Sequence, residues 1–123
     1  MNLEEEAKKL MHDKLVIQEV MTADIYEMKA GQTAIFPKEK ALEYLALGLT
    51  SEAGEVAGKV KKLIRDGKGD KKAIAAEIGD VLWYCAMLAK ETEVPLNDIM
   101  KDNLKKLHGR KTRGTLQGSG DNR

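Results

Sequence analysis

The chain has 123 residues, the size of one ordinary domain, and 42 % of them are hydrophobic, which is enough for a core. Its 21 basic and 20 acidic residues nearly cancel, so it lacks the basic excess with which a general nucleic-acid-binding protein neutralises phosphates. The N-terminus is acidic and no apolar run approaches membrane-spanning length. We therefore expect a cytoplasmic protein without a signal peptide and with neither nucleic acid nor membrane as a partner.

Leu, Ala, Met, Lys and Glu dominate the composition, and because all are good helix formers they predict an all-α protein. The first helix is expected over about residues 3–29, where apolar side chains recur at helical spacing. Residues 30–37 contain Gly31 and Pro37 and read as a loop. A second helix is then expected from near Pro37 to near Arg65.

The segment 66–70 reads Asp-Gly-Lys-Gly-Asp and is the clearest turn signal in the chain. It predicts a hairpin between the second helix and a third over about residues 71–91. Pro95 then marks the start of a fourth helix. Four helices with short connections fit an antiparallel four-helix bundle, and the first two are long enough to pack against a second subunit.

The composition becomes polar and Gly-rich after His108, with no helical pattern. Residues 1–111 are therefore expected to form a single helical domain and residues 112–123 a polar tail. The one cysteine, Cys85, lies in an apolar helical run without basic neighbours. A buried, unreactive thiol is expected there.

A short acidic pattern occurs twice. Glu52-Ala-Gly-Glu55-Val is repeated as Glu77-Ile-Gly-Asp80-Val, with an acid, a glycine, an acid and a valine in matching places. Acids three residues apart lie on one face of a helix, with Cβ atoms about 5–6 Å apart. If the second and third helices form a hairpin, the two pairs can converge into one carboxylate cluster.

Surface ion pairing is the alternative explanation, since 33 % of the residues are charged. The duplication and the apolar surroundings of both motifs favour a functional site. So do the mid-helix glycines Gly54 and Gly79, which each cost about 1 kcal/mol relative to Ala and therefore indicate close helix approach.

Carboxylates forced together need a cation to remain ionised. A bundle di-iron site would use Glu-x-x-His pairs, but the two histidines, His12 and His108, lie far from both motifs in the sequence. An all-oxygen site suits Mg²⁺, with Mn²⁺ as a possible substitute, and Mg²⁺ commonly also binds phosphate oxygens.

Further side chains extend the same helical faces and are candidates for substrate binding. Basic and amide groups beside a metal suit a polyphosphate, although singly such residues are more often solvated helix surface. The candidates are Lys59, Lys62, Tyr84, Asn103, Lys106 and Arg110.

Glu-x-x-Glu followed after 21 residues by Glu-x-x-Asp resembles the signature of the MazG-like all-α nucleoside triphosphate pyrophosphohydrolases. The resemblance extends to Leu47-Gly48-Leu49, to Val81-Leu82-Trp83-Tyr84, to Asn103-Leu104-x-Lys106-Leu107 with Arg110, and to the ending 113–123. It covers roughly residues 40–123 well and the first helix loosely.

The resemblance implies Mg²⁺-dependent cleavage of a nucleoside triphosphate into a monophosphate and pyrophosphate. By position, Glu52, Glu55, Glu77 and Asp80 carry over as metal ligands, and either Glu52 or Glu55 as the residue that activates water. Asn103, Lys106 and Arg110 match positions associated with sugar or phosphate contacts. Tyr84 is a candidate wall for the nucleoside or a core residue.

The resemblance also implies a homodimer or homotetramer with sites near subunit interfaces, which the tail could reach. Three alternatives stay open: a related bundle hydrolase for phosphoribosyl-ATP or an alarmone, a non-catalytic nucleotide- or metal-binding regulator, and a purely structural helical protein. The sequence does not distinguish the preferred base.

Overall fold

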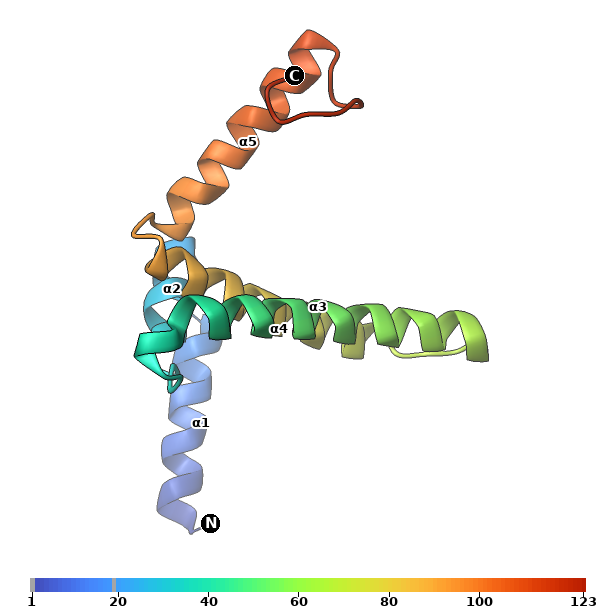
Figure 1. Ribbon diagram of the computed structural model, residues 1–123. Coiled ribbons are helices and arrows are strands. Elements are labelled where there is room, and N and C mark those ends of the chain that lie inside the picture. The colour runs from blue at the N-terminus through green and yellow to red at the C-terminus, as the bar shows by residue number, and fades with distance from the viewer. Residues whose placement is uncertain (1, 19) are drawn as a thin grey trace.

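The computed structural model describes residues 2–18 and 20–123, with backbone alone for residues 14–18. The described residues contain helices and connecting segments and no strand, so the predicted all-α class is confirmed. Its elements, shown in Figure 1, are α1 (Leu3–Gln18), α2 (Ala23–Gly31), the short 3₁₀ helix η1 (Lys38–Lys40), α3 (Ala41–Asp66), α4 (Lys71–Glu91) and α5 (Leu96–Arg113).

The expected first helix is two helices. Residues 20–22 are not helical, and residue 19 lies outside the described part. The Thr22 hydroxyl accepts a hydrogen bond from the backbone N–H of Ile25 at 3.2 Å, which caps a free N–H at the start of α2. The single helix predicted over about residues 3–29 is therefore wrong, because a capped second start interrupts it.

The predicted hairpin is confirmed. After α3 the backbone turns at Gly67, whose φ of 67° is the left-handed conformation that glycine adopts without steric cost. Asp70 then caps α4 by accepting a hydrogen bond from the Lys72 N–H at 2.9 Å. Helices α3 and α4 pack side by side along this hairpin (Figure 1).

The core lies at the base of the hairpin, where α2 and the start of α5 pack against the end of α4. The Glu27 carboxylate also accepts a hydrogen bond from the Leu96 N–H at 3.2 Å, which ties α2 to the first turn of α5. From this junction the hairpin, α1 and α5 leave in three directions (Figure 1). The buried apolar residues are Ala30, Ala41, Leu45, Ala86, Met87, Ala89 and Leu96.

One glycine sets the closest approach of α3 to α4, and it is Gly48. A Cβ at Gly48 would overlap the ring of Tyr84. At Gly54 and Gly79 a Cβ would meet nothing within 4 Å. The expectation that the two motif glycines mark the helix contact is therefore wrong within one chain, since both face open space.

The C-terminal segment folds back on α5. The helix continues to Arg113, although the composition after His108 shows no helical pattern. Arg110 is only 6 % exposed and donates a hydrogen bond to the Asp121 carbonyl at 2.9 Å. Arg123 donates to the carbonyls of Thr115, Leu116 and Gly120. These bonds hold the tail in a compact loop at the end of α5.

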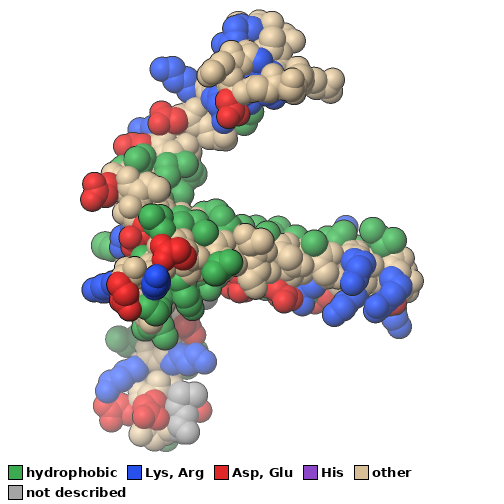
Figure 2. Space-filling view, in the orientation of Figure 1, with side chains coloured by type: hydrophobic (Ala, Val, Ile, Leu, Met, Phe, Trp, Pro, Cys, Tyr) green, Lys and Arg blue, Asp and Glu red, His purple; other side chains and the backbone are tan. Residues whose placement is uncertain are grey.

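The chain exposes much apolar surface. Its accessible surface is 9756 Å², whereas a folded monomer of this mass exposes about 6,600 Å². Hydrophobic side chains run along one edge of the hairpin (Figure 2), and Leu47 and Ile64 are 72 % and 79 % exposed. None of the helices in the described part is long and apolar enough to span a membrane.

Candidate functional site

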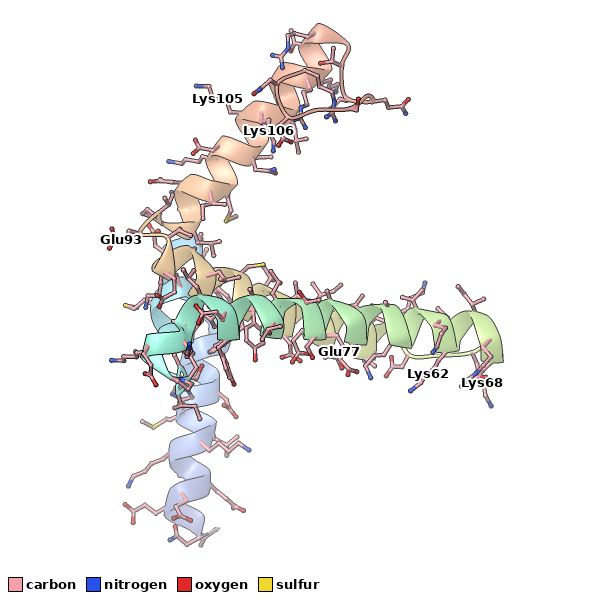
Figure 3. All side chains as sticks on the ribbon, viewed as in Figure 1. Lys62, Lys68, Glu77, Glu93, Lys105 and Lys106 are labelled. Carbon is pink, nitrogen blue, oxygen red and sulfur yellow. The ribbon has the colours of Figure 1, made fainter. Side chains whose placement is uncertain are left out.

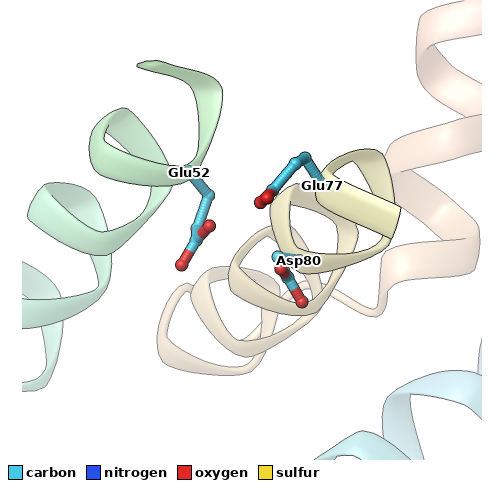
Figure 4. A group of neighbouring side chains, drawn as sticks. All are labelled: Glu52, Glu77 and Asp80. Carbon is cyan, nitrogen blue, oxygen red and sulfur yellow. The ribbon is translucent and has the colours of Figure 1, made fainter. Parts of the chain in front are cut away.

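Three carboxylates converge across the hairpin. Glu52 comes from α3, and Glu77 and Asp80 come from one face of α4, as Figure 4 shows. One oxygen from each carboxylate lies within 4.8 Å of the others. We call these three residues the acid group. The convergence predicted from the repeated motif is thus observed for one acid of the first pair and both acids of the second.

The fourth predicted acid, Glu55, lies outside the acid group. It is three residues further along α3 and its side chain is exposed. Its charge nevertheless reaches the group, because it is one of the causes that raise the pKa of Glu52. Glu55 is therefore near the three converging carboxylates without sharing their tight geometry.

The acid group is electrostatically unfavourable by itself. Desolvation is the largest cause that raises the pKa of Glu52, followed by the negative charges of Asp80 and Glu77. Glu52 and Glu77 are partly buried and Asp80 is exposed. Oxygen ligands with this charge and spacing fit a hard divalent cation such as Mg²⁺, which would remove the repulsion. The two histidines lie elsewhere, on α1 and α5.

Lys59 lies beside the acid group. Its ammonium is 3.5 Å from a Glu77 carboxylate oxygen, and the pair is partly shielded from solvent. Lys62 is exposed and lines a cavity further along the hairpin together with Lys59. Both lysines predicted to bind substrate thus lie on the acid side of α3, as the helical spacing indicated.

Tyr84 lies at the other side of the acid group. Burial raises its pKa, with further contributions from Tyr44 and from the charge of Glu52. Tyr44 was not among the predicted site residues. The sequence feature that could have identified Tyr44 as a site residue is its position four residues before Gly48 and eight before Glu52. This spacing places all three residues on one face of α3. Tyr44 also stacks on Phe36 with ring centroids 5.8 Å apart.

Trp83 belongs to the packing of the core. Its indole N–H lies 2.8 Å from the Thr33 hydroxyl oxygen and 3.2 Å from the Ala30 carbonyl, both of which accept from it. Its ring meets Tyr84 edge-on at 5.0 Å. Trp83 therefore fixes the position of Tyr84 instead of facing the acid group itself.

The predicted substrate contacts on α5 do not join the acid group within one chain. Asn103 and Lys106 line a shallow hollow on α5 with Ile99 and Asp102. In the described part of the chain α5 packs on α2 and α4 and makes no contact with α3. Arg110 is buried against the tail.

Comparisons with known proteins identify the family to which the chain belongs. Residues 40–114, which include the acid group, match the family model described as the MazG nucleotide pyrophosphohydrolase domain. The chain is also 46 % identical over 114 residues to the Gene 37 protein of Mycobacterium phage L5, a match that covers 84 % of this chain and all of the phage protein. No solved structure matches significantly. Because the family model covers more than half of its residues, this chain belongs to the MazG nucleotide pyrophosphohydrolase domain family.

Proposed function

We propose that the protein is a Mg²⁺-dependent nucleoside triphosphate pyrophosphohydrolase that converts a (d)NTP and water into a (d)NMP and pyrophosphate. The observation that carries the proposal is the convergence of Glu52, Glu77 and Asp80 within 4.8 Å, in a chain of the MazG family. A partly buried acid group of this kind has no compensating cation in the chain except Lys59, in the part that the structure describes.

Glu52, Glu77 and Asp80 would hold the cation, because their oxygens are already close enough to share one site. When bound, Mg²⁺ or Mn²⁺ would neutralise charge on phosphate oxygens and would lower the pKa of water. Glu55 is the better candidate to accept the proton of the attacking water, since it is near the group but outside it. The water oxygen would form a bond to the α-phosphorus while the bond from that phosphorus to the α–β bridging oxygen breaks, so that pyrophosphate leaves and the monophosphate remains.

The residues on the two sides of the acid group are proposed to contact different parts of the substrate. Lys59 and Lys62, on the side of the hairpin tip, are proposed to contact phosphates. Tyr84, with Tyr44 beside it, is proposed to form a wall for the nucleoside on the opposite side. Arg110 is proposed to act without contacting the substrate, because its guanidinium donates to the Asp121 carbonyl and so holds the tail against α5.

Assembly into a homodimer or homotetramer is part of the proposal. The surface excess of about 3,000 Å² over a monomer of this mass is what an obligate oligomer would bury. A second chain would also explain Asn103 and Lys106, which reach no acid in their own chain and are proposed to meet the site of a partner. The proposed role is housecleaning of the nucleotide pool, in the cytoplasm, where free nucleotides would be the substrates.

A panel of canonical and modified nucleotides with Mg²⁺, assayed for pyrophosphate and orthophosphate, tests the proposal. Pyrophosphate and a monophosphate are expected in equal amounts. Hydrolysis of phosphoribosyl-ATP or an alarmone alone would reassign the substrate. Nucleotide binding without pyrophosphate at stoichiometric enzyme would identify a regulator and contradict the proposal.

A further inference from the structure

A cavity of about 150 Å³ lies between the C-terminal part of α3 and the N-terminal part of α4, next to the turn of the hairpin. Its walls carry three lysines, and its apolar lining comes from Leu63, Ala73 and Ile74. Figure 3 labels Lys62 and Lys68 towards the free end of the hairpin, with Glu77 nearer the middle. The third lysine, Lys59, connects the cavity to the acid group.

The charge in this cavity is unbalanced. Three lysines face one acid there, Asp70, whose carboxylate accepts a hydrogen bond from the backbone N–H of Lys72 at 2.9 Å and keeps its negative charge. Neither Lys62 nor Lys68 forms an ion pair in the described part of the chain, although Asp66 lies near enough to Lys62 for that lysine to contribute, after Arg65, to lowering the pKa of the Asp66 carboxyl. Ammonium groups around a small concave surface favour an oxyanion with several oxygens.

Lys59 belongs both to the cavity and to the surroundings of the acid group. It lines the cavity, and its ammonium lies 3.5 Å from the Glu77 carboxylate. Without a divalent cation, Lys59 is the positive charge that offsets the acid group. A divalent cation held by Glu52, Glu77 and Asp80 would repel the Lys59 ammonium. It would also neutralise the Glu77 carboxylate, which now attracts that ammonium.

We propose that the cavity is an oxyanion site for the phosphate groups of substrate or product, and that Lys59 leaves Glu77 and completes this site when a divalent cation binds the acid group. The proposal rests on the proposed metal site. It adds Lys68 as a phosphate contact and makes Lys59 a competitor of the cation. Metal and phosphate binding are then coupled through one side chain.

The first measurement is a titration of the protein with Mn²⁺ alone, in which binding is measured by isothermal titration calorimetry. Lys59→Met should bind Mn²⁺ at least about fivefold more tightly than the unmodified protein, because a competitor is gone. Lys59→Arg, which keeps the charge, should stay close to the unmodified protein. Lys61→Met, at an exposed position that does not line the cavity, is the matched control. Unchanged or weaker Mn²⁺ binding by Lys59→Met would overturn the competition.

The second measurement is pyrophosphate binding at saturating Mn²⁺. Lys68→Met should weaken it by at least about fivefold while leaving Mn²⁺ binding alone unchanged, whereas Lys72→Met, exposed and outside the cavity, should do neither. Equal pyrophosphate affinity of these two variants would reject the oxyanion site. If the unmodified protein binds Mn²⁺ and pyrophosphate as described but hydrolyses no nucleotide, the proposed function fails and this inference stands.

Discussion

Replacement of Gly48 by alanine tests the contact that sets the spacing of α3 and α4. The added Cβ would overlap the Tyr84 ring, and that ring is confined because Trp83 meets it edge-on at 5.0 Å. Alanine is favoured over glycine inside a helix by about 1 kcal/mol. Overpacking in a well-packed region costs about 1–3 kcal/mol, and here the obstacle is a ring instead of a flexible chain end.

A rigid ring puts the overpacking cost towards the upper end, about 2–3 kcal/mol, and subtracting the helix preference of about 1 kcal/mol means that Gly48→Ala should lower the free energy of unfolding by about 1–2 kcal/mol. For a chain of this size that corresponds to a fall in Tm of about 4–8 °C. The effect should also reach the site, because moving α3 away from Tyr84 separates Glu52 from Asp80. Mn²⁺ affinity should therefore fall with stability.

Gly58→Ala is the matched control, since a Cβ there meets nothing within 4 Å. It should raise the free energy of unfolding by up to about 1 kcal/mol through helix preference alone. Both variants are compared by circular dichroism melting at one fixed protein concentration, because assembly makes Tm depend on concentration. A Gly48→Ala protein as stable as Gly58→Ala, with unchanged Mn²⁺ affinity, would refute the reasoning.

Three further predictions concern single side chains. The raised pKa of Glu52 should make the metal-free protein lose stability as pH rises from about 4.5, its ordinary value, through the folded-state pKa. Glu52→Gln should flatten that loss in urea unfolding with EDTA, and an unchanged slope would assign it to other groups. Burial raises the pKa of Cys85, so its reaction with Ellman's reagent at pH 7.5 should be at least about tenfold slower in the native protein than in denaturant. Arg110→Met should cost about 1–3 kcal/mol and expose the tail to limited proteolysis, which the exposed-site variant Lys111→Met should not.

The hairpin and most of the acid group were predictable because their signals are local. The Gly-rich turn and the acids spaced i, i+3 are both patterns of residues that are close together in the sequence. The absence of Glu55 from the group could not be predicted from this spacing, because Glu77 and Asp80 have the same spacing and both converge. Two residues three apart diverge by about 60° around a helix, so one acid of a pair can face across the hairpin while the other faces solvent.

The errors concern features that a local pattern does not determine. The break before α2 has a capping threonine, but Ile25 follows where a capping box would have Glu or Gln, so the apolar periodicity appeared continuous. Which glycine meets a neighbour depends on the register of α3 against α4, and this register puts Gly48 against Tyr84. The fold of the tail depends on Arg110 and Arg123 finding backbone carbonyls several residues away.

The central claim is that the acid group holds a divalent cation in order to release pyrophosphate, with Glu55 as a nearby base. The most direct test is one preparation of Glu55→Gln, assayed for Mn²⁺ binding and for pyrophosphate release from the best nucleotide of the panel. The account predicts helicity and Mn²⁺ affinity close to those of the unmodified protein and a loss of turnover of at least about a hundredfold. Substantial pyrophosphate release by this variant, with its metal still bound, would contradict the account.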